Sequence, residues 1–384
     1  MTTRALSAEE RKEFLNRGFS RRNFGRIATM LTAGAALPFY NEPALAQLSM
    51  RNGPIPPDAV KIDANENPMG PCPEAAEAIH NIVKSGGRYM YDLTGDLRTA
   101  LAETEGIKPE YVHPYAGSSA PLHQAVLAFC SPQRSFVVAD PGYEAGERAA
   151  TFVGAKTVKV PLTQDYAHDV KAMAAADPNA GLLYLCNPNN PTGTLTAREN
   201  IEWLLANKPA GSILMVDEAY IHIAEAAVPS TDLAAKGSDV VVLRTFSKLY
   251  GMAGLRAGAA IGHPDLLKKI QNYSAGALPI TAVVGATTSL KVKGLVAERR
   301  KAIKDVREDT FAFLDKHNFH YVPSVSNKFM VDTKRPGREV IDAMAQEKVL
   351  IGRVWPVWPT YVRVTVGTRD DMAKFKAAFL KVMA

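Results

Sequence analysis

The chain has 384 residues, of which 47% are hydrophobic and 22% are charged. This composition is typical of globular proteins, so it excludes a disordered or fibrous chain, and the length allows a large domain plus a smaller one. The net charge of +6 is too small to indicate a nucleic-acid-binding protein, and we expect no nucleic-acid partner.

The N-terminal region has the three parts of an export signal in the expected order. These parts are a twin-arginine motif, an apolar run and a small-residue cleavage region, at 20–26, 27–39 and 43–47. We therefore expect residues 1–46 to be a twin-arginine signal peptide that directs export, to the periplasm, and leaves no stable membrane anchor. Cleavage after Ala46 would leave 38 of the 45 Lys and Arg and 35 of the 39 Asp and Glu, a net charge of +3. A basic amphipathic helix is the alternative.

Cysteine and histidine usage argues against disulfides and metals. The three cysteines are an odd number at wide spacings, namely Cys72, Cys130 and Cys186. The eight histidines are scattered, and the sequence contains no Cys-x-x-Cys or His-x-x-x-His cluster. We expect no metal site.

In chain order, the first elements after the signal belong to a segment, 47–85, that we expect to pack with a small C-terminal domain. Gly and Pro content predicts an extended arm at 51–57, followed by a strand at 61–63. Apolar spacing and breaker residues then predict a helix at 73–84, an aromatic loop at 88–91 and a second helix around 97–105. The loop and the second helix already belong to the large domain.

Strands alternate with helical stretches through the predicted large domain, 86–275, which is the pattern of an α/β fold with a mostly parallel, helix-covered sheet. Four apolar runs there end in polar residues, namely Phe136–Ala139, Leu182–Cys186, Ile213–Val216 and Val240–Leu243. Ligands of open α/β sheets bind outside the carboxyl ends of the strands. The polar residues after these runs should therefore converge on one crevice.

The remaining part, 276–384, is predicted to be a smaller α+β domain with its linking helix. A strand at 257–261 precedes it. Within it we expect a long helix at about 290–316, a strand at 329–332 and a helix at 338–347. A strand at 361–366 and a final helix should follow.

The stretch Arg244–Arg256 places one lysine, Lys248, just after a predicted strand. A lysine there can act as a nucleophile toward an aldehyde, although a surface lysine is the plain alternative. An aldehyde cofactor that acts as an electron sink also needs a carboxylate, donors for a ring oxygen, an anion cradle and a flat ring partner. Strand ends and one helix start supply candidates for all four. The carboxylate is Asp217, the donors are Asn190 and Tyr220, the anion cradle is Ser118 with Ser247 and Arg256, and the flat partner is Tyr143.

Three segments resemble the signature of fold-type I pyridoxal-phosphate aminotransferases, in particular their histidinol-phosphate aminotransferase-like branch. They are Asn187–Gly193, Asp217–Tyr220 and Arg244–Arg256. The segments Asn65–Pro68 and Tyr361–Thr368 also resemble that branch, so the similarity covers nearly all of the chain after the signal. The resemblance implies a large pyridoxal-phosphate domain, a smaller α+β domain and ping-pong transfer of an amino group between an amino acid and a 2-oxo acid.

By this resemblance, Lys248 would bind the cofactor aldehyde and act as the general base, and Asp217 would pair with the ring nitrogen. Asn190 and Tyr220 would bind the ring oxygen, and Tyr143 would stack on the ring. The phosphate would be held at the helix start and after the lysine, by Gly117, Ser118, Ser119, Ser247 and Arg256.

The resemblance also implies a substrate side and a dimer. Arg363 would clamp the substrate α-carboxylate, a task suited to a bidentate guanidinium. The other candidates for substrate contact are Asn67, Arg353, Trp355 and Trp358. Tyr89 would reach the phosphate of a neighbouring subunit, which implies a homodimer with shared sites.

Two departures from the branch border the expected substrate pocket. Ser119 and Ala120 stand where relatives that act on histidinol phosphate usually have an Asp-Glu pair, and the loop 352–359 is bulkier and more apolar. The specificity therefore stays open, with an aromatic amino acid as a candidate near Trp355 and Trp358. An amino-acid oxidase or lyase with the same cofactor, and an exported paralogue without catalysis, are the alternative functions.

Overall fold

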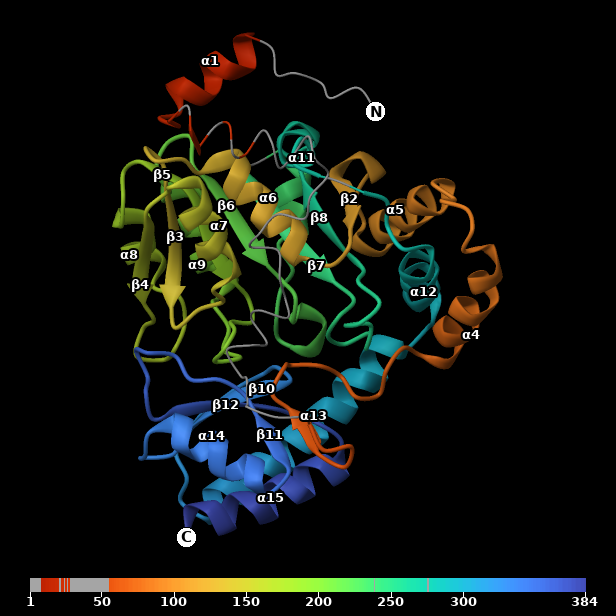
Figure 1. Cartoon of the computed structure of the whole chain (residues 1–384), viewed down its shortest axis with the longest axis vertical. Coiled ribbons are helices and arrows are strands. Elements are labelled where there is room, and N and C mark those ends of the chain that lie inside the picture. Colours follow the sequence, from red (N-terminus) through yellow and green to blue (C-terminus); the bar gives the residue numbers. More distant parts are fainter. Residues whose placement is uncertain are drawn as a thin grey trace.

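The computed structural model describes residues 8–20, 22–23, 25, 27, 55–237, 239–274 and 276–384 (Figure 1). Seven strands form the central sheet of the large domain in the order β2-β8-β7-β6-β5-β3-β4. Their bounds are β2 Val112–Tyr115, β3 Ser135–Asp140, β4 Thr157–Pro161, β5 Ala180–Cys186, β6 Ile213–Asp217, β7 Val240–Thr245 and β8 Gly258–Gly262. Strand β8 runs opposite to the other strands of this sheet, which share one direction, so the predicted mostly parallel α/β fold is confirmed.

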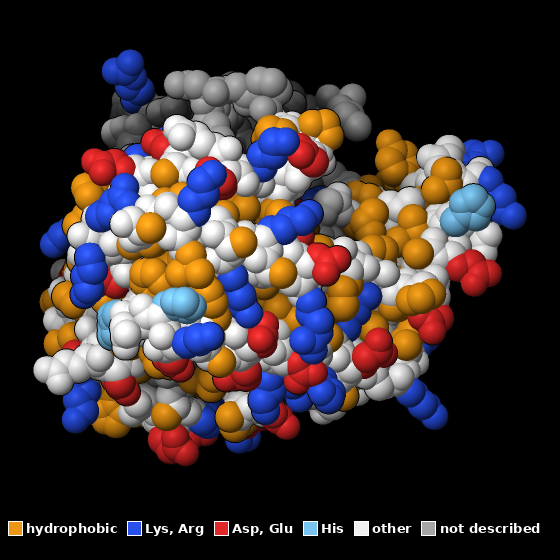
Figure 2. Space-filling model, turned by 90° about the horizontal axis from the view of Figure 1, so that it is seen from below, with side chains coloured by type: hydrophobic (Ala, Val, Ile, Leu, Met, Phe, Trp, Pro, Cys, Tyr) orange, Lys and Arg blue, Asp and Glu red, His pale blue; other side chains and the backbone are white. Residues whose placement is uncertain are grey.

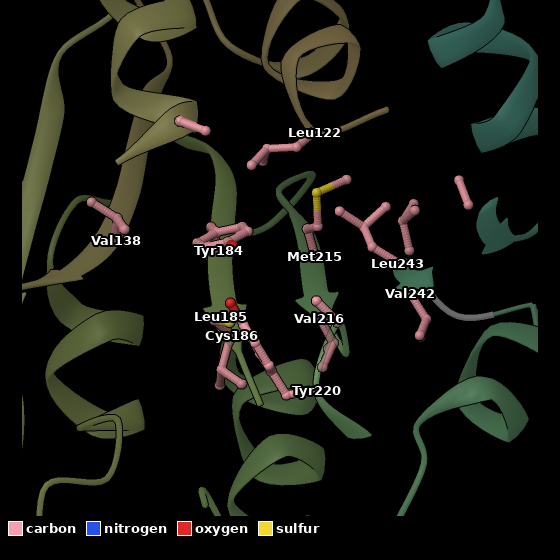
Figure 3. Close-up of a cluster of buried hydrophobic side chains, with 14 of the residues drawn as sticks. Leu122, Val138, Tyr184, Leu185, Cys186, Met215, Val216, Tyr220, Val242 and Leu243 are labelled. Carbon is pink, nitrogen blue, oxygen red and sulfur yellow. The ribbon is translucent and has the colours of Figure 1, made fainter. Parts of the chain in front are cut away.

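The central strands are mostly apolar because helices flank the sheet (Figure 1). Every residue of β5, β6 and β7 is buried. The flanking helices of the large domain are α5 Asp92–Glu105, α6 Ser119–Phe129, α7 Ala145–Val153, α8 Val170–Ala175, α9 Arg198–Asn207, α10 Thr231–Ala235 and α11 Pro264–Gln271, with short 3-10 turns at Pro109–Tyr111 and Ile221–Ile223. Figure 3 shows this core, with Cys186 and Tyr220 at its lower end, where the chain leaves the strands.

The small domain lies below the carboxyl ends of the parallel strands in Figure 1. Its antiparallel sheet has the order β12-β10-β9, formed by β9 Tyr321–Val322, β10 Lys328–Asp332 and β12 Tyr361–Thr365. Helices α13 Leu295–Lys316, α14 Gly337–Gln346 and α15 Arg369–Met383 pack with it. A separate parallel pair joins β1 Val60–Ile62 to β11 Val349–Ile351, so the segment before the large domain contacts the C-terminal part.

The helix expected at about 290–316 is α13, Leu295–Lys316, which begins a few residues later than expected, and the helix that precedes it was not predicted. Helix α12, Ile280–Lys291, packs against α4, Pro73–Ile82, and α5 in the large domain, and it ends before α13 begins. Gly294 separates the helices with a φ of 81°, a left-handed conformation that glycine adopts without strain. Within the described residues, no single helix is long and apolar enough to cross a membrane. Helices α12 and α13 reach that length and composition only when taken together, and the two are bent by 90° relative to each other.

The described part of the N-terminal region contacts the large domain. Helix α1, Ala8–Asn16, leads to Arg17, whose Nη2 donates to the carbonyls of Leu127 and Ala128 at 2.9 Å and of Cys130 at 3.1 Å. These carbonyls lie at the end of α6, where a cation is favoured. The expected cleavage region and most of the apolar run of the signal lie outside the described residues.

Candidate active site

A cavity of about 460 Å³ lies between the carboxyl ends of the central strands and the small domain. The large domain contributes Ser118, Ser119, Tyr143, Asn190, Asp217, Tyr220, Ser247, Lys248 and Arg256 to its lining, and the small domain contributes Arg353 and Arg363. These side chains come from segments far apart in the sequence. The predicted convergence of polar strand ends therefore occurs.

Lys248 stands in a tight turn directly after β7. The turn is closed by hydrogen bonds from Gly251 N to Lys248 O and from Met252 N to Phe246 O, both 3.0 Å. A side chain at Gly251 would overlap the backbone of Gly70, and its φ of 68° is left-handed, so the turn requires glycine there. The Lys248 Nζ lies 5.7 Å from the centroid of the Tyr220 ring.

Asp217, the last residue of β6, is a buried carboxylate that is 3% exposed. Its Oδ2 accepts a hydrogen bond from Tyr184 Oη at 2.7 Å, and its Oδ1 accepts one from Ala219 N at 3.1 Å. Burial raises the pKa of Asp217, while these two donors oppose that rise. This carboxylate lines the cavity, where it is suited to pair with a cationic ring nitrogen.

An anion cradle is formed by the start of α6 and the residues after Lys248. Ser118 caps α6 without a side-chain hydrogen bond to the helix, so the first backbone N–H groups remain available to an anion. Arg256 Nη1 donates to Ser247 Oγ at 3.3 Å. Gly117 has a φ of 88°, and a Cβ there would overlap the Arg256 guanidinium. Together these residues form a cradle suited to an anion such as a phosphate.

Asn65 organises the donors on the opposite side of the cavity. Its Nδ2 donates to Tyr220 Oη at 3.1 Å and to Asn190 Oδ1 at 3.4 Å. Asn190 Oδ1 also accepts from Arg363 Nη1 at 3.1 Å. Burial raises the pKa of Tyr220, so its hydroxyl keeps a proton that it can donate to a ring oxygen.

The two arginines of the small domain lie next to each other. Arg363 Nη2 donates to Asp63 O at 2.5 Å, whereas its buried Nε has no partner. Burial lowers the pKa of Arg363 to about 10, which still leaves it cationic at neutral pH. Arg353 pairs with Glu144 and stacks on Trp355, with its Cζ 4.6 Å from the ring centroid. The cavity thus holds two guanidinium groups on its substrate side.

Several predicted residues do not line this cavity. Asn67 donates to Leu249 O at 2.8 Å, Trp355 is fully buried behind the arginines and donates to Gly142 O at 2.9 Å, and Trp358 packs against Tyr166. Gly117 acts through the space it leaves for Arg256. Tyr89 is 70% exposed on the surface of this protomer.

Sequence reasoning missed four residues of the site and its surroundings. They are Asn65, Tyr184, Glu144 and Lys328. Asn65 and Tyr184 lay in segments that were already singled out, and a tyrosine inside an apolar strand is a signal for a hydrogen bond at its end. Glu144 and Lys328 gave no signal, because their partners are distant in the chain.

The residues of the cavity fit pyridoxal 5'-phosphate. Lys248 would bind its aldehyde, Asp217 would pair with its ring nitrogen, and the cradle around Ser118 and Arg256 would hold its phosphate. Among the described residues no group of His, Cys, Asp and Glu could hold a metal ion. Fold and site together define a pyridoxal-phosphate enzyme of fold type I.

Comparisons with known proteins identify the family. Residues 57–379 match the family described as Aminotransferase class I and II, and the chain belongs to it. A histidinol-phosphate aminotransferase of Moorella thermoacetica is 32% identical, covering 85% of this chain and 86% of that protein. An aromatic amino acid aminotransferase of Nocardia farcinica is 35% identical, covering 83% and 90%. The structure of histidinol-phosphate aminotransferase from Sinorhizobium meliloti in complex with pyridoxal-5'-phosphate has 26% identity and a TM-score of 0.79, covering 91% and 95%.

The protein is therefore a pyridoxal-phosphate-dependent aminotransferase, in class EC 2.6.1.-. Bound pyridoxal phosphate supplies an electron sink for the substrate α-carbon. With the cofactor bound, Asp217 would keep a proton on the ring nitrogen, and Arg363 would orient the substrate through its α-carboxylate. The amine of Lys248 would move the proton at the α-carbon.

Proposed function

We propose that this enzyme exchanges amino groups between a dicarboxylic amino acid and an uncharged aromatic or imidazole amino acid. The observation that carries the proposal is the second guanidinium in the cavity. Arg353 is 5% exposed, lines the same cavity as Arg363, and has Glu144 as its counterion. A relative named as an aromatic amino acid aminotransferase is consistent with the second substrate.

Glu144 allows one pocket to accept both substrates. With a dicarboxylate, the α-carboxylate binds Arg363 and the distal carboxylate replaces Glu144 at Arg353. The Glu144 side chain is 23% exposed, so it can turn toward solvent. With an uncharged side chain, Glu144 stays on Arg353 and no buried charge is left unpaired.

Arg353→Met tests this proposal. We expect the KM for 2-oxoglutarate to rise at least tenfold, because a buried charge-assisted pair is lost, while the KM for phenylalanine changes less than threefold. Arg338→Met, at an exposed arginine of the same domain, is the matched control and should change neither. Equal effects of Arg353→Met on both substrates would refute the assignment.

We propose a homodimer in which Tyr89 reaches the phosphate site of the partner subunit. Tyr89 and Tyr91 are 70% and 68% exposed and stack at 5.4 Å, and Val83 nearby is 59% exposed. Exposed apolar side chains of this kind are typical of an interface. The lobe at the right of Figure 2, which carries α4 and α5, shows gathered hydrophobic side chains.

Mixing two inactive variants tests the shared site. Lys248→Ala and Tyr89→Ala chains should form hybrid dimers in which one site has both residues, so mixing should raise cofactor affinity at that site above the Tyr89→Ala level. A chain that sediments as a monomer, or mixing without any recovery, would contradict the shared site.

We propose that the protein is exported by the twin-arginine route, to the periplasm, with its cofactor already bound. The support is the order of motif, apolar run and cleavage region in residues 1–46. Replacement of both Arg21 and Arg22 by lysine should retain the protein in the cytoplasm. Periplasmic protein that arrives without cofactor would count against loading before transport.

A further inference from the structure

Lys328, the first residue of β10, is a second lysine beside the site. Its side chain is fully buried at 0% exposure, and its Nζ lies 3.1 Å from the centroid of the Tyr220 ring. The Nζ also donates to Ser326 Oγ at 2.9 Å. Lys328 does not line the cavity, so its effect on the cavity must pass through a neighbour.

The surroundings of Lys328 disfavour a positive charge. In the part of the chain that the structure describes, no carboxylate forms an ion pair with it. The titratable and charged groups that face it are Arg363 of β12, Lys248 after β7, Asp217 of β6 and the thiol of Cys186 at the end of β5. Burial first, then Arg363 and Lys248, hold its pKa well below the ordinary lysine value, against the opposite effect of Cys186 and Asp217.

Tyr220 is restrained at two points. Asn65 Nδ2 donates to the phenol oxygen at 3.1 Å, and the Lys328 amine covers the ring face. An N–H group directed at an aromatic face is a weak interaction, but here it is buried and its amine is anchored by Ser326. Tyr220 belongs to the large domain and Lys328 to the small one, so this contact links the orientation of the phenol to β10.

We propose that Lys328 is a positioning residue that acts through Tyr220. Its buried amine, anchored by Ser326, fixes the plane of the Tyr220 ring so that the phenol hydroxyl donates to the ring oxygen of bound pyridoxal phosphate. The proposal concerns the cofactor side of the cavity and does not depend on the substrate class proposed above.

The visible absorbance of the bound cofactor reports this hydrogen bond. A donor at the ring oxygen stabilises the form in which that oxygen is negatively charged, so it lowers the pH midpoint of the absorbance titration. Tyr220→Phe removes the donor and should raise the midpoint by about one pH unit. Lys328→Met leaves the donor but frees its ring, so the midpoint should rise by about half a unit.

A double-mutant cycle on the purified holoenzyme tests the proposal. The double variant Lys328→Met with Tyr220→Phe should have the midpoint of Tyr220→Phe alone, because on this proposal Lys328 acts on the cofactor through Tyr220. The melting temperature of Lys328→Met should be at least that of the wild type, since a buried amine without a counterion has been removed. Lys334→Met, at an exposed lysine just after β10, is the control and should leave the midpoint unchanged.

Three results would overturn the proposal. The first is a Lys328→Met midpoint equal to that of the wild type. The second is a double variant whose shift is the sum of the single shifts, which would mean that Lys328 acts on the cofactor without Tyr220. Lys328→Gln keeps an N–H donor and should return the midpoint toward the wild-type value; a Gln variant that behaves like Met would contradict the role of the amine.

Discussion

The two sides of the cavity are built in different ways. On the cofactor side, Asp217 is the last residue of β6 and Lys248 follows β7, and these neighbouring parallel strands are buried at every residue. On the substrate side, Arg353 and Arg363 come from the small domain, and their partners are Glu144 and the carbonyl of Asp63 from distant segments. The register of one sheet fixes the first side, whereas packing between segments fixes the second.

This difference separates chemistry from selectivity. Changes on the cofactor side should reduce all reactions together, because every substrate uses the same cofactor groups. Changes on the substrate side should alter the ratio between substrates. The predictions below test that division, starting with the largest expected effect.

Lys248→Ala should reduce turnover by at least about 10³-fold with every amino acid, because both the covalent attachment and the mobile proton acceptor are lost. Steady-state rates with glutamate and with phenylalanine measure the loss. Lys268→Ala, at an exposed lysine of α11, should keep the wild-type rate. Normal turnover in Lys248→Ala would refute the assignment of the site.

Asp217→Asn should lower kcat by roughly 10²-fold with both substrates, because the buried charge that holds a proton on the ring nitrogen is lost. Rapid-mixing absorbance measurements give this rate directly. Asp232→Asn, at a half-exposed surface carboxylate, is the matched control. A loss confined to one substrate would contradict the division between the two sides.

Gly117→Ala should weaken cofactor binding by about tenfold, because a methyl group there overlaps the Arg256 guanidinium and the φ of 88° strains any L-residue. Titration of the cofactor-free protein with pyridoxal phosphate measures the Kd. Gly95→Ala, at a helical glycine of α5 with open space around it, should not weaken binding.

Trp355→Phe should have the smallest effect. It removes the hydrogen bond to Gly142 O and reduces the stacking of Arg353 and Arg363, whose Cζ atoms lie 4.6 and 5.6 Å from the indole centroid. We expect KM to rise about threefold with kcat unchanged. Trp203→Phe, at an exposed tryptophan of α9, should leave KM as it is, and a fall in kcat for Trp355→Phe would place Trp355 closer to the chemistry than the structure does.

The sequence predicted one side of the site much better than the other. A polar residue that follows a buried parallel strand must lie at the edge of the sheet, so Asp217 and Lys248 could be brought together from strand ends alone. Trp355 was expected beside the substrate but lies behind the arginines, because its indole finds a backbone carbonyl in the core. Glu144 and Lys328 could not be placed from the sequence. Each contacts a residue of the other domain, Arg353 and Tyr220 respectively, and these pairs come together only in the folded chain.

Helix boundaries show the same limit. The helix predicted at about 290–316 corresponds to α13, but its predicted start lies before the break that separates α13 from α12, and α12 itself, which packs on α4 and α5, was not predicted. Only the left-handed Gly294 marks the separation locally.

The most direct test of the central claim is a half-reaction. Purified holoenzyme mixed with glutamate and no oxo acid should form one equivalent of 2-oxoglutarate per site, change its visible spectrum once and then stop until an aromatic 2-oxo acid is added. Continued turnover without any oxo acid, with release of ammonia or consumption of oxygen, would show an oxidase or lyase and contradict amino-group exchange.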